Sequence, residues 1–233
     1  MVKNESTILM LKPLSITLIT ALTASTALAE TFNITSGSTT NAGSTVNGSD
    51  TVNISGALNT GSTANERAIE TTGGTNTINL LTAGSFTTAG TFSNGIYNIG
   101  DNNTNSISGT ITTTGANGYG IVNKGDNNTN TITGSIATSG ATGLGLYNIG
   151  DNNTNSITGS ITSTGASATG VYNYGGGNST KVSGTITTSG EDADGVWSGH
   201  GTGISNTVSV TGSITTTGTG SSGVEFYGAT NSA

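Results

Sequence analysis

Four ionisable side chains that could perform acid–base chemistry occur close together in the sequence: Glu191, Asp192, Asp194 and His200, with Trp197 among them. Paired carboxylates can act as general acid and general base on a polysaccharide, as in glycosidases and lyases. A loop rich in acidic residues is also an ordinary solvated loop. His200 is the single histidine and the chain has no cysteine, so little else is available for a catalytic site. We therefore expect no enzymatic activity.

A second acidic set, Asp101, Asp126 and Asp151, recurs at a constant interval. If residues one repeat apart lie above each other, three like charges approach closely, and a calcium ion could bridge them because it prefers oxygen ligands. The sequence lacks the GGxGxD spacing of calcium-binding rolls, and Gly176 interrupts the column. Solvated turn residues are the alternative, and we expect neither a metal site nor a cofactor.

Hydroxyl side chains form the most extensive candidate surface. At the outward positions of the longer strand in each repeat, every residue is Ser or Thr except Ala137 and Lys181. Such a face could order water and bind ice, as in the β-helical antifreeze proteins whose Thr-x-Thr faces it resembles, or it could bind glycans. Alternatively, Ser and Thr are what a solvated strand contains when charge is avoided. The candidate binding residues are Thr110, Thr112, Ser160, Thr162, Thr185, Thr187, Ser213 and Thr215.

Aromatic residues recur at another outward position, which Tyr97, Tyr147, Tyr172 and Trp197 occupy, with Val122 in the same column. Exposed rings are common in contacts with sugars and proteins. Stacking of rings between neighbouring coils would instead serve only to stabilise a sheet. Both interpretations of this column remain open from the sequence.

The composition excludes several function classes. The chain has 233 residues, of which 38 are glycine and 7% are charged, and its net charge is −7. Beyond residue 29 the basic residues are Arg67, Lys124 and Lys181, so we expect no nucleic-acid partner, because phosphate binding needs clustered cations. Without cysteine there are no disulfides, thiolate metal sites or thiol catalysis. Regular placement of Ile and Val, low charge and a single proline argue against disorder.

One repeated unit, written four times from Gly95 to Asp194 without insertion, organises the chain; its first copy reads GIYNIGDNNTNSISGTITTTGANGY. A fixed period of about 25 residues is typical of a solenoid, and coils of this length favour an all-β, right-handed parallel β-helix. Alternation along the strands assigns three aliphatic columns to the core. These columns run from Ile96 to Val224, from Ile107 to Val210 and from Ile111 to Ile214.

Polar residues also recur at inward positions. Asn98 and its equivalents at 123, 148 and 173 are expected to hydrogen-bond from coil to coil. Gly109 and its equivalents are expected at a bend or a crowded interior position. Each coil is predicted to contain a strand, a turn made by GDNNTN, a longer bent strand and a second turn.

Three regions can be delimited. Residues 1–29 have the pattern of a secretory signal, with Lys3 and Lys12, a short apolar run and Ala27-Leu28-Ala29, and the run is too short to span a membrane. Residues 30–66 are predicted to form irregular N-terminal coils or a cap, and residues 67–233 the β-helix repeats, with regular coils at 95–194 and an incomplete last coil. We expect export through the inner membrane to the cell surface or the extracellular space.

The chain resembles the passenger domains of monomeric, type V autotransporters of Gram-negative bacteria. The resemblance rests on the signal pattern of residues 1–29, on the cysteine-free remainder rich in Gly, Ser, Thr and Asn, and on motifs such as Ser44-Thr45-Val46-Asn47-Gly48. It implies attachment to the outer membrane through a C-terminal barrel, for which we find no strand pattern in this sequence.

The resemblance also implies a non-enzymatic adhesin or self-associating protein. Its expected partners are host-surface molecules, polysaccharides or the protein itself. Binding of ice or glycans through the Ser/Thr face is the alternative, and a polysaccharide-active enzyme is a third.

Overall fold

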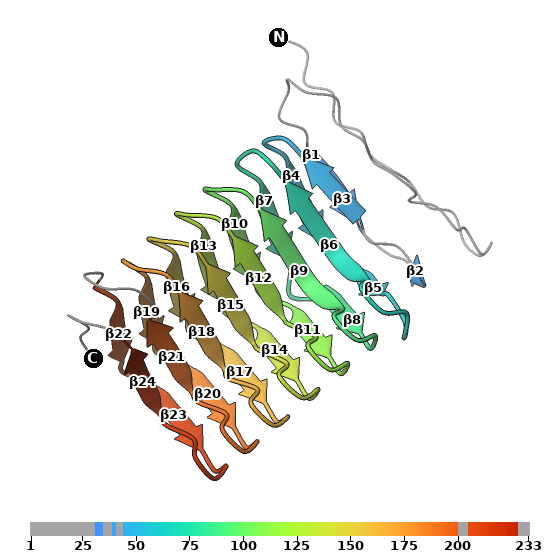
Figure 1. Ribbon diagram of the computed structural model, residues 1–233. Coiled ribbons are helices and arrows are strands. Elements are labelled where there is room, and N and C mark those ends of the chain that lie inside the picture. Colours follow the sequence, from blue (N-terminus) through green and yellow to red (C-terminus); the bar gives the residue numbers. More distant parts are fainter. Residues whose placement is uncertain (1–30, 35–38, 41–43, 200–204, 228–233) are drawn as a thin grey trace.

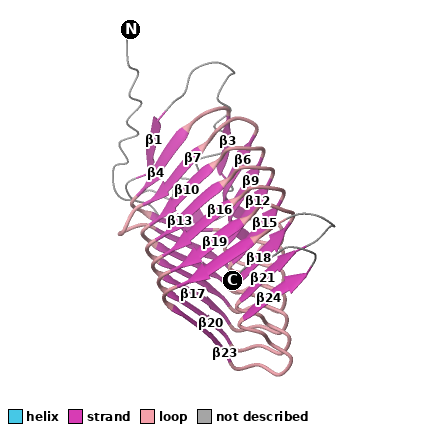
Figure 2. Cartoon of the chain, turned by 90° about the vertical axis from the view of Figure 1, so that its left-hand side faces the viewer, coloured by secondary structure: helices cyan, strands magenta, loops and turns pink. Residues whose placement is uncertain are grey.

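The computed structural model describes residues 31–34, 39–40, 44–199 and 205–227, which form strands and turns. The chain winds into a stack of coils (Figure 1), and each regular coil contributes one strand to each of three parallel sheets (Figure 2). This confirms the predicted all-β parallel solenoid and its coil length. Across the described ranges, no helix is long and apolar enough to cross a bilayer. The predicted leader, residues 1–29, lies outside them.

We call the sheets A, B and C, and each has eight strands. Sheet A contains β1 (Thr31–Ile34), β4 (Thr51–Ile54), β7 (Thr77–Leu80), β10 (Thr104–Ile107), β13 (Thr129–Ile132), β16 (Thr154–Ile157), β19 (Ser179–Val182) and β22 (Thr207–Val210). Sheet B contains β2 (Thr39–Thr40), β5 (Ala57–Asn59), β8 (Ser85–Thr88), β11 (Thr110–Thr113), β14 (Ser135–Thr138), β17 (Ser160–Ser163), β20 (Thr185–Thr188) and β23 (Ser213–Thr216). Sheet C contains β3 (Ser44–Asn47), β6 (Arg67–Thr72), β9 (Asn94–Ile99), β12 (Ile121–Lys124), β15 (Leu146–Ile149), β18 (Val171–Tyr174), β21 (Val196–Gly199) and β24 (Val224–Tyr227).

Residues one repeat apart are paired in the regular coils. Ile107 pairs with Ile132, and Ile132 pairs with Ile157. The coil length changes toward both ends of sheet A: the pairing offset is shorter between β1 and β4, and longer between β7 and β10 and between β19 and β22. Pairing in register therefore survives changes in coil length, because the turns take up the added or missing residues.

The three predicted aliphatic columns fill the interior, with buried members that include Ile96, Ile107, Ile111, Ile121, Ile132, Ile136, Leu146, Ile157 and Ile161. Each such side chain contributes about 1.5–3 kcal/mol when fully buried. The prediction is wrong for Val210, which is 41% exposed, and Ile214 and Val224 are only partly buried. These residues belong to β22, β23 and β24, the last described strands of their sheets, so no other described strand packs over them.

The predicted longer strand is in fact two strands, β10 and β11, which belong to sheets A and B. The chain turns between them at Ser108 and Gly109, whose N–H groups both donate to Leu80 O, at 2.7 and 3.1 Å. The glycine at this corner is required by space. A Cβ on Gly134, the equivalent residue of the next coil, would lie 2.0 Å from the carbonyl oxygen of Gly109. The expected bend and the expected crowding therefore coincide.

The predicted asparagine ladder is present inside sheet C. Asn98 Nδ2 donates to Asn123 Oδ1 at 2.7 Å, and Asn123 Nδ2 donates to Asn148 Oδ1 at 2.7 Å. Asn148 continues the ladder to Asn173 at 2.8 Å, and all of these side chains are buried. Since a buried amide without a partner is costly, repetition of the same residue is what makes this polar interior stable.

A second ladder was not predicted. The sequence assigns the whole GDNNTN segment to a turn, but Thr104 and Asn105 begin β10, and Asn105 is fully buried. Asn105 Nδ2 donates to Asn130 Oδ1 at 2.8 Å, and Asn98 Nδ2 donates across to Asn105 Oδ1 at 3.2 Å. The two ladders join sheets A and C through one hydrogen-bonded network, which holds the outward residues of both sheets in fixed positions.

Candidate functional site

The outward face of sheet C carries rings in contact. Tyr97, Tyr147, Tyr172 and Trp197 alternate with buried residues along their strands and are themselves half-buried. The ring centroids of Tyr147 and Tyr172 lie 5.4 Å apart, edge to face, and those of Tyr172 and Trp197 lie 4.2 Å apart and are stacked. Both geometries are favourable for aromatic pairs. The rings are thus in contact from coil to coil between Tyr147 and Trp197.

Two further rings extend this surface, and the sequence analysis missed both. Tyr119 lies in the turn before β12, and its ring centroid is 5.6 Å from that of Tyr147. The ring centroids of Tyr227 and Trp197 lie 6.4 Å apart, and Tyr227 is 65% exposed. Asn94 Oδ1 holds Tyr119 in place by accepting its N–H at 2.9 Å. The available signal was a tyrosine at the end of the first copy of the repeat and another in the last coil. We call Tyr119, Tyr147, Tyr172, Trp197 and Tyr227 the ring column.

Burial disfavours ionisation of three of these rings. Desolvation raises the pKa of Tyr119, and it is the main reason that the pKa values of Tyr147 and Tyr172 are raised. Since an ordinary tyrosine ionises at about 10, these three phenols are neutral at pH 7 and can donate and accept hydrogen bonds.

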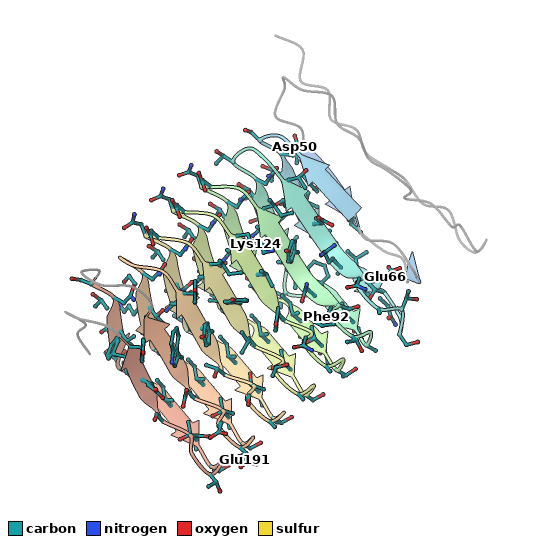
Figure 3. All side chains as sticks on the ribbon, viewed as in Figure 1. Asp50, Glu66, Phe92, Lys124 and Glu191 are labelled. Carbon is teal, nitrogen blue, oxygen red and sulfur yellow. The ribbon has the colours of Figure 1, made fainter. Side chains whose placement is uncertain are left out.

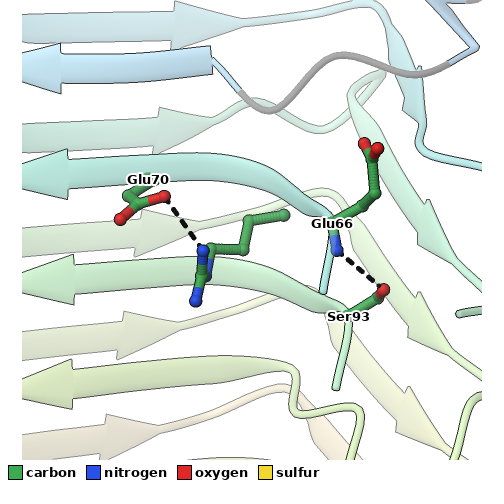
Figure 4. Close-up of polar contacts among 4 residues, drawn as sticks. Glu66, Glu70 and Ser93 are labelled. Carbon is green, nitrogen blue, oxygen red and sulfur yellow. Dashed lines mark hydrogen bonds and ion pairs between the residues drawn. The ribbon is translucent and has the colours of Figure 1, made fainter. Parts of the chain in front are cut away.

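Cations gather at one end of this face. The Arg67 guanidinium carbon lies 4.2 Å from the Tyr97 ring centroid, and Lys124 Nζ lies 5.4 Å from it. Arg67 also forms an ion pair with Glu70 at 3.2 Å, and the Glu66 N–H donates to Ser93 Oγ at the start of the same strand (Figure 4). Arg67, Tyr97 and Lys124 border a hollow of about 300 Å³. The sequence analysis named the cations only as too few for nucleic acid.

The candidate hydroxyl residues lie on sheet B, where Thr110, Thr112 and their equivalents in β17, β20 and β23 face outward. The hydroxyls that precede them in the same coils belong to sheet A or to the corner, so the predicted single face is divided between two sheets. Some hydroxyls bond from coil to coil, as Thr133 Oγ1 does to Ser108 Oγ at 3.0 Å. This surface can hydrogen-bond water or sugar hydroxyls without any charge.

The carboxylates of Asp101, Asp126 and Asp151, the aspartate column, accept hydrogen bonds from the backbone of the next coil. Asp101 Oδ1 accepts the N–H of Asp126 at 2.8 Å, Asp126 Oδ1 accepts that of Asp151 at 2.8 Å, and Asp151 Oδ1 accepts that of Gly176 at 2.8 Å. A backbone donor is therefore placed between successive carboxylates, which offsets their repulsion. Within the described ranges, no group of three or more His, Cys, Asp or Glu residues is arranged to hold a metal ion.

The acidic residues near Trp197 are not brought together as one site. Glu191 and Asp192 are exposed in a turn, where Asp192 has a φ of 50°. Asp194 is buried, and its Oδ1 accepts the N–H of Ser222 from the next coil at 2.7 Å. His200 lies outside the described residues. The one placed carboxylate of this set that is buried thus bonds the backbone of a turn.

Comparison with known proteins adds no relative: no family model, no curated protein and no solved structure matches the chain.

Proposed function

We propose that the chain is a non-enzymatic passenger of the autotransporter type, exported to the cell surface, where it binds other surfaces or further copies of itself. The β-solenoid is the fold that such a passenger requires. The composition, the leader pattern and the repeat support the same assignment. Binding occurs through the outward face of sheet C.

The observation that carries this proposal is the ring column. Its rings come from different coils and contact one another on strands that are paired along their lengths. Rings fixed in this way lose little conformational entropy on binding, which leaves more of the contact energy for affinity. Aromatic residues are also enriched at binding surfaces because they combine apolar area with a polar group. Repeated weak contacts along the stack then add up.

The test removes two rings and compares an equal change on sheet B. We expect the purified Tyr172→Ala/Trp197→Ala protein to lose at least tenfold in retention on polysaccharide-coated surfaces or in self-association by sedimentation velocity, because each lost ring contact is worth roughly 1 kcal/mol or more. The control, Thr162→Ala/Thr187→Ala, should behave as the parent protein. Circular dichroism verifies the fold of both. Equal binding by the parent and a folded ring variant would contradict the proposal.

A further inference from the structure

The outward column of sheet C is interrupted at one place. At the position where the neighbouring coils carry Tyr97 and Tyr147, β12 carries Val122, and the three are paired in register. Val122 is only 1% exposed and forms part of the lining of the hollow of about 300 Å³ described above. We call it the Val122 hollow; its lining also includes the rings of Phe92, Tyr97 and Tyr147, the cations Arg67 and Lys124, and three asparagine amides.

The positive charge of the described chain is concentrated here. Its basic residues are Arg67, Lys124 and Lys181, and the first two border the hollow, whereas Lys181 lies on β19 in sheet A. Lys124 is exposed and forms no ion pair with any described residue. Arg67 is ion-paired with Glu70 at 3.2 Å, so Lys124 supplies the uncompensated positive charge at the hollow. In a chain with a net charge of −7, this is the place that favours an anion.

Phe92 provides an independent sign of a ligand. The turn position it occupies has a positive φ in every regular coil, and its equivalents are Asn117, Thr142, Ser167 and Asp192. Short polar residues tolerate that conformation, whereas a bulky aromatic residue there is an outlier. Phe92 is nevertheless 51% exposed, at the edge of the hollow. Figure 3 labels it at the turns and Lys124 on the strands of the same face. Its ring is thus placed where a ligand can contact it.

The backbone around the hollow is not available to a ligand. β6, β9, β12 and β15 are inner strands of sheet C, each paired on both sides. A peptide therefore cannot bind by adding a strand, which is how an extended chain gains main-chain hydrogen bonds. Recognition must use side chains: rings, amides and two cations. That combination suits the apolar face, the hydroxyls and the acidic group of a sugar.

From these observations we propose that the Val122 hollow binds an acidic sugar residue of a polysaccharide, with its carboxylate or sulfate between Arg67 and Lys124. The sugar ring packs against the rings of Tyr97, Tyr147 and Phe92, and the amides bond its hydroxyls. Cation-bound carboxylates and sulfates share this chemistry. The inference rests on the proposed surface-binding function and assigns it a ligand class and a first contact point.

The experiment measures binding of the purified full chain to polygalacturonate, dextran sulfate, uncharged dextran and polyglutamate. We expect binding to one or both acidic polysaccharides, weakening with salt, and none to uncharged dextran. Which of the two binds decides between carboxylate and sulfate. Binding to polyglutamate alone, or equal binding to uncharged dextran, would overturn the proposal.

Matched variants locate the site. Arg67→Gln and Lys124→Gln should each weaken binding of the acidic polysaccharide at least tenfold, while Lys181→Gln, the same change of charge on sheet A, should leave it unchanged. If Lys181→Gln weakens binding as much, the attraction is non-specific and the hollow is not the site.

Val122→Tyr separates this inference from the proposed function. The variant places at this position the residue that the neighbouring coils carry. Because Val122 is only 1% exposed, circular dichroism must show that the variant folds before its binding is compared. It should no longer bind the acidic polysaccharide, yet it should retain the adhesion or self-association that depends on Tyr172 and Trp197. Unchanged polysaccharide binding by Val122→Tyr would refute the hollow while leaving the ring column in place. Loss of function in Tyr172→Ala/Trp197→Ala tests the ring column alone.

Discussion

Sheets B and C are built on the same repeat but present different surfaces. Both have eight parallel strands, which pair at one constant offset through the regular coils. Sheet B repeats Ser and Thr at its outward positions with one substitution, Ala137, in these coils. Sheet C carries rings, the aliphatic side chains of Ile99 and Ile149 and two cations at its outward surface. The interiors of the coils, in contrast, repeat almost without change.

This difference shows where the constraint of stacking applies. An inward residue must match its neighbours above and below, because it shares a column with them and has no access to water. An outward residue is free of that requirement. Departures from the repeat on the outside, such as Lys124 and Phe92, are therefore the places where selection for a ligand can be sought. The uniform hydroxyls of sheet B are what solvation alone would produce.

The largest expected effect comes from breaking the scaffold that both faces share. Gly134→Val places a Cβ 2.0 Å from Gly109 O, so the backbone must move, and the bond from Gly134 N–H to Ile107 O is lost with it. We expect a destabilisation of about 3–5 kcal/mol or failure to fold, since overpacking and a lost buried bond add. Thermal unfolding followed by circular dichroism measures it.

The matched control is Ser135→Val, at the next residue, where the side chain is on the outward surface of β14. It should change stability by no more than about 0.5 kcal/mol, as surface substitutions usually do. Binding through sheet C should be lost in Gly134→Val. A stable Gly134→Val protein would show that the corner can relax and that glycine is not needed there.

A smaller loss of stability is expected from Asn123→Ala, and it should affect sheet C more than sheet B. The substitution removes the shorter of the two hydrogen bonds that Asn98 Nδ2 donates and leaves the Asn148 oxygen without its donor, both in the buried interior beneath sheet C. We expect a loss of about 2–5 kcal/mol. Hydrogen exchange should rise more in β12 and β15 than in β14 and β17, because sheet B packs on the aliphatic columns.

Asn79→Ala is the control for this prediction. Asn79 Nδ2 also donates to an asparagine one coil away, Asn53 Oδ1, at 2.8 Å, but both side chains are only partly buried. Water can replace that bond, so the loss should stay below about 1 kcal/mol. Equal losses for Asn79→Ala and Asn123→Ala would mean that burial of the ladder does not determine its contribution.

The fold could be predicted from the sequence because its interior is written as columns at a fixed spacing. Ile107, Gly109 and Ile111 specify a strand, a corner and a strand, although the corner was taken for a bend within one strand. The second asparagine ladder could not be predicted, since Asn105 lies in a segment whose composition is that of a turn. The hollow could not be predicted either, because Arg67 and Lys124 are distant in the sequence and meet only through the stacking of coils.

The smallest expected effect is a loss of stability at high pH, to which the tyrosines of sheet C contribute and the hydroxyls of sheet B do not. Because burial raises the pKa values of Tyr119, Tyr147 and Tyr172, folding favours their neutral form. This contribution to stability is complete below the unfolded pKa of about 10 and is lost as the pH rises through the folded values. The Ser and Thr hydroxyls of sheet B do not titrate in this range. Stability should therefore fall above a pH of about 10 through sheet C alone.

Ultraviolet absorbance, which follows tyrosinate formation, provides the measurement. The folded protein should titrate at a higher pH than the same protein in guanidinium chloride, and Tyr147→Phe should remove part of the delayed fraction. Thr162→Ala should leave the curve unchanged. Superimposable folded and unfolded titrations would mean that water reaches these rings freely. In that case the ring column would be a row of separate side chains, and the contrast between the faces would be one of composition only.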